Sequence, residues 1–339
     1  MPPLDAGRAR ALNADRAKLP GARALASPRA WRAWLQAHAM ATRPDTPIRL
    51  ETLKLRPGRR LTVRTQVGRS TFYVKVYRPE RARSVEAKYL ELARLLAGVR
   101  DLRLPRLRAA DPDLGIVVWE SFGGTALLPT SSPGAFRRVG RVLARIHATR
   151  LPAERIWTPA RELEVLAERL ADAPAATRSL APVVASRLTG TARPRTIHRD
   201  FYADQVLIGR RRGPVAILDW DDATLGPPAL DVGNALAHLE LAGLRAPRLA
   251  RRLPDLRRAF LDGYRTASKK NSEGAWRIWE GAALLRLSGL AWSRRRGRDP
   301  VERGPSMSIA TIREEAELLA GLAEQRLGGG KRGGGRRGR

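Results

Sequence analysis

The stretch from residue 196 to residue 236, TIHRDFYADQVLIGRRRGPVAILDWDDATLGPPALDVGNAL, decides how this chain is interpreted. Two short apolar runs, at 206–209 and 215–218, flank a basic turn at 210–214. This pattern predicts a tight β-hairpin, with a polar loop before it and an acidic segment after it.

The predicted hairpin brings oxygen ligands together at its open end. Antiparallel pairing centred on Arg212 would set Gln205 opposite Asp219, and directly opposed Cα atoms lie roughly 4.5–5.5 Å apart. Asp200 lies on the loop that enters the hairpin. An amide and carboxylates that converge in this way suit a hard cation such as Mg²⁺ and a hydroxyl that must lose a proton. The residues therefore indicate phosphoryl transfer.

This stretch resembles a known family. The pattern H-x-D-x-x-x-x-N, followed by an apolar-I-D-W-E/D segment, is similar to the catalytic and metal loops of the aminoglycoside phosphotransferase/choline kinase-like family. His198, Asp200, Asp219 and Asp221 match this pattern, whereas Gln205 stands where the family has Asn.

The resemblance implies an α+β, bilobal protein-kinase-like fold, with a small antiparallel β-sheet lobe and a mainly helical lobe. It implies Asp200 as the base or hydroxyl-orienting group, Asp219 as the main metal ligand, and Gln205 and Asp221 as auxiliary ligands. The side chains of His198 and Asp231 are expected to have structural roles, and Asp231 would hold the catalytic loop.

A lysine in the middle of a strand marks the expected nucleotide site. Alternating apolar residues predict strands at 48–56, 60–67 and 71–77, and Lys75 lies among the apolar residues of the last. Burying an unpaired ammonium group is costly, so Lys75 needs a partner. Glu86, on a helix expected at 84–98, is the natural one, and Glu91 is the alternative.

In the resembling family, such a pair serves the nucleotide: Lys75 would hold the phosphates and Glu86 would orient Lys75. The turn after the first strand has one glycine, so its arginines, Arg59 and Arg60, could contact phosphates or could simply be exposed. The resemblance also implies that an adenine edge meets backbone groups at the end of the run GIVVWES, namely those of Trp119, Glu120 and Ser121.

The whole chain is expected to divide into four regions. These are an N-terminal helical extension (1–45), the β-rich nucleotide-binding lobe (46–124), the helical catalytic and substrate lobe (125–327) and a disordered Gly/Arg tail (328–339). Residues 1–26 show little periodicity and are expected to form a loose arm. Ser27-Pro28 predicts a helix start, and Asp231 is expected to cap a helix that runs to Leu241.

The composition restricts the class of protein. The chain has 339 residues, no cysteine and a net charge of +31. Neither a disulfide framework nor a Cys-ligated zinc site can form. No run approaches the ~20 apolar residues of a membrane span, so we expect a cytoplasmic protein. The arginines are scattered, which favours compositional bias over a nucleic-acid surface, although the tail could bind phosphate polymers or anionic surfaces weakly.

The sequence therefore predicts a phosphotransferase that uses ATP, or another nucleoside triphosphate, with Mg²⁺ to phosphorylate a small hydroxyl compound. Between Leu244 and Lys270 only Asp255 and Asp262 are acidic, which predicts a neutral or anionic, sugar-like acceptor. The alternative is a catalytically degenerate kinase fold that binds nucleic acid or an acidic partner through its basic surface.

Overall fold

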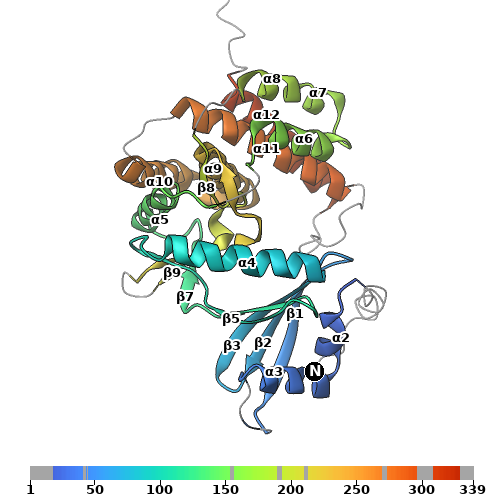
Figure 1. Cartoon of the computed structure of the whole chain (residues 1–339). Coiled ribbons are helices and arrows are strands. Elements are labelled where there is room, and N and C mark those ends of the chain that lie inside the picture. Colours follow the sequence, from blue (N-terminus) through green and yellow to red (C-terminus); the bar gives the residue numbers. More distant parts are fainter. Residues whose placement is uncertain are drawn as a thin grey trace, which may run out of the picture. The chain divides into compact units, whose positions relative to one another are not determined.

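The chain forms two compact units in the computed structural model (Figure 1). The first comprises Met1–Arg94 and Leu104–Gly123, and the second comprises Leu95–Arg103 and Gly124–Arg339. The structure describes residues 18–40, 43, 45–152, 156–188, 193–209, 213–268, 273–295 and 308–328. The expected tail, apart from Gly328, lies outside these residues.

An antiparallel five-stranded sheet is the framework of the first unit. Its strand order is β1-β2-β3-β6-β5, formed by β1 (Ile48–Arg56), β2 (Arg60–Val67), β3 (Ser70–Tyr77), β6 (Ile116–Glu120) and β5 (Leu107–Asp111). Alternation along β3 buries Phe72, Val74 and Val76 on one face, as the period of two predicts. The mixed α+β class with an antiparallel sheet is thereby confirmed.

Two N-terminal helices, α2 (Gly21–Ala26) and α3 (Pro28–Ala37), belong to the core of this unit. Ser27 caps α3 by accepting a hydrogen bond from the Ala30 amide, as predicted. The expectation of a loose arm is wrong from residue 18 onward, because Leu19 is fully buried and the Gly21 amide donates to the Leu114 carbonyl. Local periodicity cannot show these long-range contacts.

The long helix α4 (Pro79–Leu96) starts five residues earlier than the sequence predicts. Proline suits a first helical position, and the Arg78 carbonyl accepts the first helical hydrogen bond from Ala82. Its apolar residues at helical spacing, Val85, Tyr89, Leu92 and Leu96, are all buried.

The second unit is mainly helical. Its principal helices are α5 (Pro133–Ile146), α6 (Pro159–Leu170), α7 (Ala175–Arg178), α8 (Leu180–Arg187), α9 (Pro228–Arg245), α10 (Leu253–Ser268), α11 (Glu273–Arg295) and α12 (Ile309–Arg326). Helix α9 starts at Pro228, so Asp231 lies within its first turn and is not its cap. No helix in the described part of the chain is long and apolar enough to span a bilayer.

Two small sheets carry the loops of the second unit. One has the order β4-β10-β9-β7, formed by β4 (Leu102–Arg103), β10 (Val215–Ile217), β9 (Val206–Gly209) and β7 (Gly124–Ala126). The other pairs β8 (Arg195–Ile197) with β11 (Thr224–Gly226). The loop between β8 and β9 therefore starts and ends on paired strands.

Buried ion pairs join the helices of this unit. Glu280 on α11 is fully buried and accepts two hydrogen bonds of 2.6 Å from Arg257 on α10. Arg326 on α12 also contacts Glu280, at 2.9 Å. A buried carboxylate needs such compensation, and these two partly exposed arginines supply it.

Candidate active site

The hairpin of β9 and β10 forms, but in a register one residue away from the predicted one. Val206 pairs with Ile217, and Gln205 therefore lies opposite Leu218, whose amide donates to the Gln205 carbonyl at 2.8 Å. The prediction that Gln205 faces Asp219 is wrong. The Gly209 amide donates to the Pro214 carbonyl, so Pro214 belongs to the ladder and the connection is one residue shorter than assumed.

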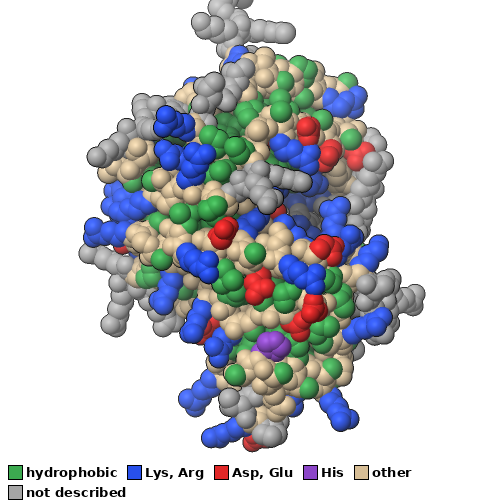
Figure 2. Space-filling model, in the orientation of Figure 1, with side chains coloured by type: hydrophobic (Ala, Val, Ile, Leu, Met, Phe, Trp, Pro, Cys, Tyr) green, Lys and Arg blue, Asp and Glu red, His purple; other side chains and the backbone are tan. Residues whose placement is uncertain are grey.

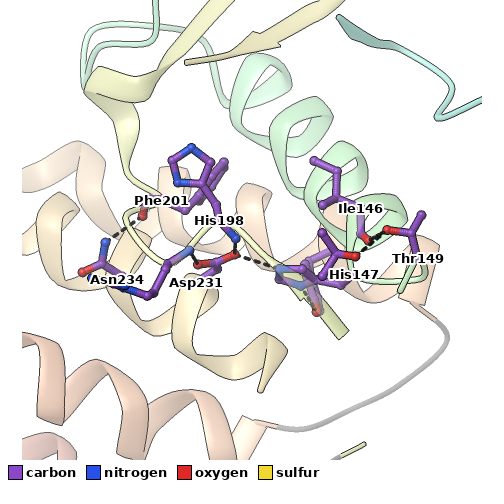
Figure 3. Close-up of polar contacts among 10 residues, drawn as sticks. Ile146, His147, Thr149, His198, Phe201, Asp231 and Asn234 are labelled. Atoms are coloured by element: carbon purple, nitrogen blue, oxygen red, sulfur yellow. Dashed lines mark hydrogen bonds and ion pairs between the residues drawn. The ribbon is translucent and has the colours of Figure 1, made fainter. Parts of the chain in front are cut away.

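Asp231 anchors the loop that contains Asp200 (Figure 3). Its buried carboxylate accepts hydrogen bonds from the amides of His198 and Arg199, both at 2.7 Å. A carboxylate that accepts backbone N–H groups makes strong, charge-assisted hydrogen bonds. The first turn of α9 thereby fixes the backbone immediately before Asp200.

A second layer holds Asp231, and sequence reasoning missed it. Nε2 of His147 donates to Asp231 at 3.1 Å, and Nδ1 of His147 lies 2.8 Å from the Tyr264 hydroxyl. Burial, and then the charge of Asp231, raise the pKa of Tyr264, so its hydroxyl keeps its proton and can donate to His147. His147 and Asp231 are 84 residues apart in the sequence, so local patterns could not show that they are partners.

His198 holds the open end of the hairpin at the residue that follows β10. Its Nε2 donates to the Leu218 carbonyl at 2.7 Å, and its ring meets that of Trp220 edge to face. Leu218 is thus held between Gln205 and His198, and it immediately precedes Asp219.

Two residues of the candidate site have left-handed backbone conformations. Asp219 has φ 58° and Arg199 has φ 72°, and neither is a glycine. Such conformations cost free energy in a residue with a side chain and persist where the surrounding structure holds them. At Asp219 this conformation ends the alternation of β10 and redirects the carboxylate.

Asp200 lies among charges of both signs. Burial raises the pKa of its carboxyl group above the usual value, while Arg286 and then His198 lower it. Asp219 and Asp222 raise it again by like-charge repulsion. The structure therefore brings Asp200, Asp219 and Asp222 into one electrostatic neighbourhood, although the sequence had not singled out Asp222.

The donor chemistry of this neighbourhood suits Mg²⁺. The described residues include no group of three or more His, Cys, Asp or Glu side chains arranged as a metal site. Mg²⁺, however, commonly uses only one or two carboxylates and completes its shell with water and phosphate oxygens. Mutually repelling carboxylates are relieved by a cation, and Asp219, with Gln205 and the buried Asp221 as auxiliaries, could hold one.

The predicted nucleotide residues lie in the first unit. Lys75 pairs across the sheet with Thr62 and Val117, and its Nζ lies 5.0 Å from the centroid of the Trp119 ring. Glu86 is half-buried on α4. Its pairing with Lys75 stays a prediction, as does that of Glu91.

The turn between β1 and β2 is built as the sequence suggests. Gly58 adopts φ 64°, which favours glycine, and Nε of Arg78 donates to the Gly58 carbonyl at 2.8 Å. Arg59 is exposed at this turn and Arg60 opens β2. Both side chains could reach an anion.

Two backbone amides in the segment that was expected to meet an adenine edge already donate hydrogen bonds within the protein. The Glu120 amide donates to the Arg106 carbonyl at 2.9 Å, and the Ser121 amide donates to Thr71 at 3.0 Å. A base that binds along Trp119–Ser121 would therefore have to use carbonyl oxygens there, or amides beyond Ser121.

The comparisons agree with this geometry. A sequence model described as the phosphotransferase enzyme family matches residues 54–269. No curated protein sequence matches the chain.

Solved structures share its fold. The choline kinase LicA from Streptococcus pneumoniae has a TM-score of 0.61 at 16% identity, with 89% of this chain and 98% of that chain covered. A choline/ethanolamine kinase family protein from Mesorhizobium loti has a TM-score of 0.60 at 20% identity, covering 88% and 96%. Spectinomycin phosphotransferase APH(9)-Ia, solved with ADP and spectinomycin, has a TM-score of 0.57 at 14% identity, covering 88% and 99%. At these identities the likeness shows the fold alone.

Proposed function

Because the chain belongs to the phosphotransferase enzyme family, we propose that it transfers the terminal phosphoryl group of ATP, or of another nucleoside triphosphate, to a hydroxyl group of a small molecule. The observation that carries this proposal is the loop around Asp200, which Asp231 holds through two backbone amides. A reaction with little covalent chemistry for the protein depends mainly on positioning, and this loop supplies it.

Nucleotide use has independent support. One protein of the same fold was solved with ADP and spectinomycin, and LicA was also solved with AMP. In the first unit, Lys75 and Glu86 would serve the phosphates, with Arg59 and Arg60 as further cations. The backbone of Trp119, Glu120 and Ser121 would meet the base through its carbonyl groups.

The site residues of the second unit have separate chemical roles in this proposal. Asp200 accepts the hydroxyl proton or orients the hydroxyl, and its half-buried position limits competition from water. Asp219, Gln205 and Asp221 would hold Mg²⁺, which neutralises charge on the transferring phosphoryl group. Asp231 and His198 position these groups without touching the reacting atoms.

The acceptor is proposed to be neutral or anionic, because the protein carries a net charge of +31 and few carboxylates after the metal loop. The second candidate function is a degenerate kinase fold that acts as a basic binding module. No observation in the site favours it over catalysis.

Two substitutions test the assignment. Asp200→Asn should lower turnover at least about a thousandfold while nucleotide affinity stays within about threefold, because the carboxylate acts on the hydroxyl and not on the nucleotide. Asp219→Asn should lower turnover and also weaken Mg-nucleotide binding at least about tenfold.

Turnover is measured by ADP release and binding by Mg²⁺-dependent thermal shift with a non-hydrolysable ATP analogue. Arg277→Gln, an exposed change on α11, is the control. Activity retained in both Asp variants would contradict the mechanism, and binding that needs no Mg²⁺ would favour the degenerate fold.

A further inference from the structure

Contacts extend from both sides of Asp200 to three helices of the second unit. On the side before Asp200, the guanidinium of Arg199 lies 4.0 Å from the centroid of the Trp157 ring. Nε1 of Trp157 donates to Glu162 on α6 at 2.9 Å. The residue preceding Asp200 is therefore linked to α6 through an indole ring.

On the side after Asp200, the Phe201 carbonyl accepts a hydrogen bond of 3.0 Å from Nδ2 of Asn234 on α9 (Figure 3). Oδ1 of the same amide accepts a hydrogen bond from Arg286 on α11. Since an amide has one donor end and one acceptor end, these two partners fix the orientation of Asn234.

Arg286 joins the two sides. Its Nε lies 3.6 Å from Oε1 of Glu162, and the two side chains are only 18% and 9% exposed. The contacts therefore run from Arg199 through Trp157, Glu162, Arg286 and Asn234 to Phe201. We propose that Arg286 is a positioning residue, which closes this circuit and so holds the loop on both sides of Asp200. The inference rests on the proposed function only for the role of Asp200.

The electrostatics agree with this geometry. Burial raises the pKa of Asp200, and Arg286 on α11 is the foremost charge that lowers it, ahead of His198 on the loop itself. Asp219 and Asp222, after the hairpin, act in the opposite sense. Arg286 thus supplies the positive charge that a carboxylate surrounded by like charges requires.

The chemistry of arginine explains why this position is specific. A planar guanidinium can contact Asn234 and Glu162 in different directions at once, whereas a lysine ammonium is a point charge on a flexible stem. Arg286→Gln removes the charge and shortens the side chain. Arg286→Lys keeps the charge but removes the planar guanidinium that contacts both partners. Arg277→Gln makes the same chemical change at an exposed position of the same helix and serves as the matched control.

The first measurement is amide hydrogen exchange of the segment from His198 to Val206 in the full chain, without nucleotide or acceptor. Arg286→Gln should speed exchange there about tenfold, since local opening becomes easier, and Arg277→Gln should leave it unchanged. Arg286→Lys should lie between the two. Exchange in Arg286→Gln equal to that of the wild type would overturn the circuit, whether or not the protein proves to be a phosphotransferase.

The second measurement is the steady-state rate of Mg-ATP hydrolysis, with water as the acceptor. The rate is divided by the concentration of nucleotide-binding sites to give kcat. In Arg286→Gln, kcat should fall about tenfold or more while KM for ATP stays within about twofold, and Arg286→Lys should recover part of kcat. A general loss of structure would instead change the number of binding sites. An active wild type whose kcat is unaffected by Arg286→Gln would refute the positioning role. A wild type that neither binds nor hydrolyses Mg-ATP would refute the proposed function and leave the exchange result to decide the circuit.

Discussion

At the scale of single residues, the candidate site holds several groups in states that lower the stability of the folded protein. Asp200 is placed where burial and two like-charged neighbours disfavour its ionised form, and Arg286 and His198 oppose these effects only in part, because the net direction of the pKa shift is upward. Asp219 and Arg199 hold left-handed backbone conformations. Groups held in such states are typical of sites that need preorganisation.

Asp200→Asn should therefore stabilise the fold at neutral pH. The folded-state pKa of Asp200 lies above its unfolded-state value, so ionisation destabilises the folded protein once the pH exceeds both values. Asparagine removes this penalty while keeping the shape. Each kcal/mol gained would raise Tm by roughly 1–2 °C in a chain of 339 residues.

The sign of the pH dependence distinguishes this explanation from better packing. As the pH falls through the raised pKa towards the ordinary value for aspartate, about 3.9, the wild-type carboxyl group becomes protonated and the difference in Tm should disappear. Melting curves from pH 4 to pH 8, recorded without nucleotide or Mg²⁺, provide the test. A difference that grows in acid would show that the stabilisation does not come from the carboxyl charge.

At the scale of helices and strands, most elements could be predicted from sequence periodicity, and the errors have physical causes. Strands β2 and β3 alternate along most of their length, β1 alternates up to a register shift between Thr52 and Lys54, and the bounds of all three agree with the prediction within one residue. The β9–β10 register failed because a single residue in the connection changes every pairing, and the sequence does not show that Pro214 pairs with Gly209.

The parts of the candidate site that sequence reasoning missed depend on contacts between distant residues. The spacing of His198, Asp200 and Asp219 is local and could be recognised. His147 follows the last residue of α5, and Asn234 and Arg286 lie on α9 and α11. Nothing in their local sequence indicates that they support the same loop. Such residues can be identified only from the tertiary structure.

The packing of α5 against α10 depends on two glycines. A Cβ atom at Gly140 would overlap the Phe260 carbonyl oxygen, and one at Gly263 would overlap the Arg137 carbonyl oxygen. Because the obstacles are backbone atoms, the helices would have to separate. Gly140→Ala and Gly263→Ala should each lower the free energy of unfolding by about 1–3 kcal/mol.

Gly321 provides the matched control for this prediction. It also lies within a helix, α12, but no atom outside its own helix backbone and chain neighbours lies within 4 Å of a Cβ built there. Gly321→Ala should therefore stabilise the protein by about 0.5–1 kcal/mol, through helix propensity alone. Urea denaturation of the three variants measures both effects, and equal shifts in the same direction would show that close packing is not the cause.

At the scale of the whole molecule, much of the positive charge is locally balanced. On the face drawn in Figure 2, Lys and Arg side chains are scattered and not gathered in one patch. Arg245 pairs with Glu315 at 2.7 Å, and Arg257 pairs with Glu280 at 2.6 Å. Two arginines of the segment from Leu244 to Lys270 are thus neutralised by carboxylates outside it, and the segment is less positive than its composition suggests. The prediction of a neutral or anionic acceptor therefore depends mainly on the net charge of +31.

A net charge of this size should still discriminate among acceptors before they reach the site. Long-range fields change encounter rates by about 10–1,000-fold at low ionic strength, and salt screens them. We therefore expect kcat/KM for neutral sugars, sugar acids and sugar phosphates to exceed that for aminoglycosides at least about tenfold at low salt. The disadvantage of the polycations should diminish as salt is added.

A truncated chain separates this global field from a local acceptor pocket. The segment 329–339 contributes five basic residues, namely Lys331, Arg332, Arg336, Arg337 and Arg339, and no acidic one. Its removal lowers the net charge from +31 to +26 without touching any residue of the candidate site. If the field decides, truncation should raise kcat/KM for aminoglycosides and lower it for anionic acceptors, and both changes should vanish at high salt. A strong preference for aminoglycosides at low salt, insensitive to truncation, would mean that carboxylates in the neighbourhood of Asp200, such as Asp222, select the acceptor and that the net charge does not.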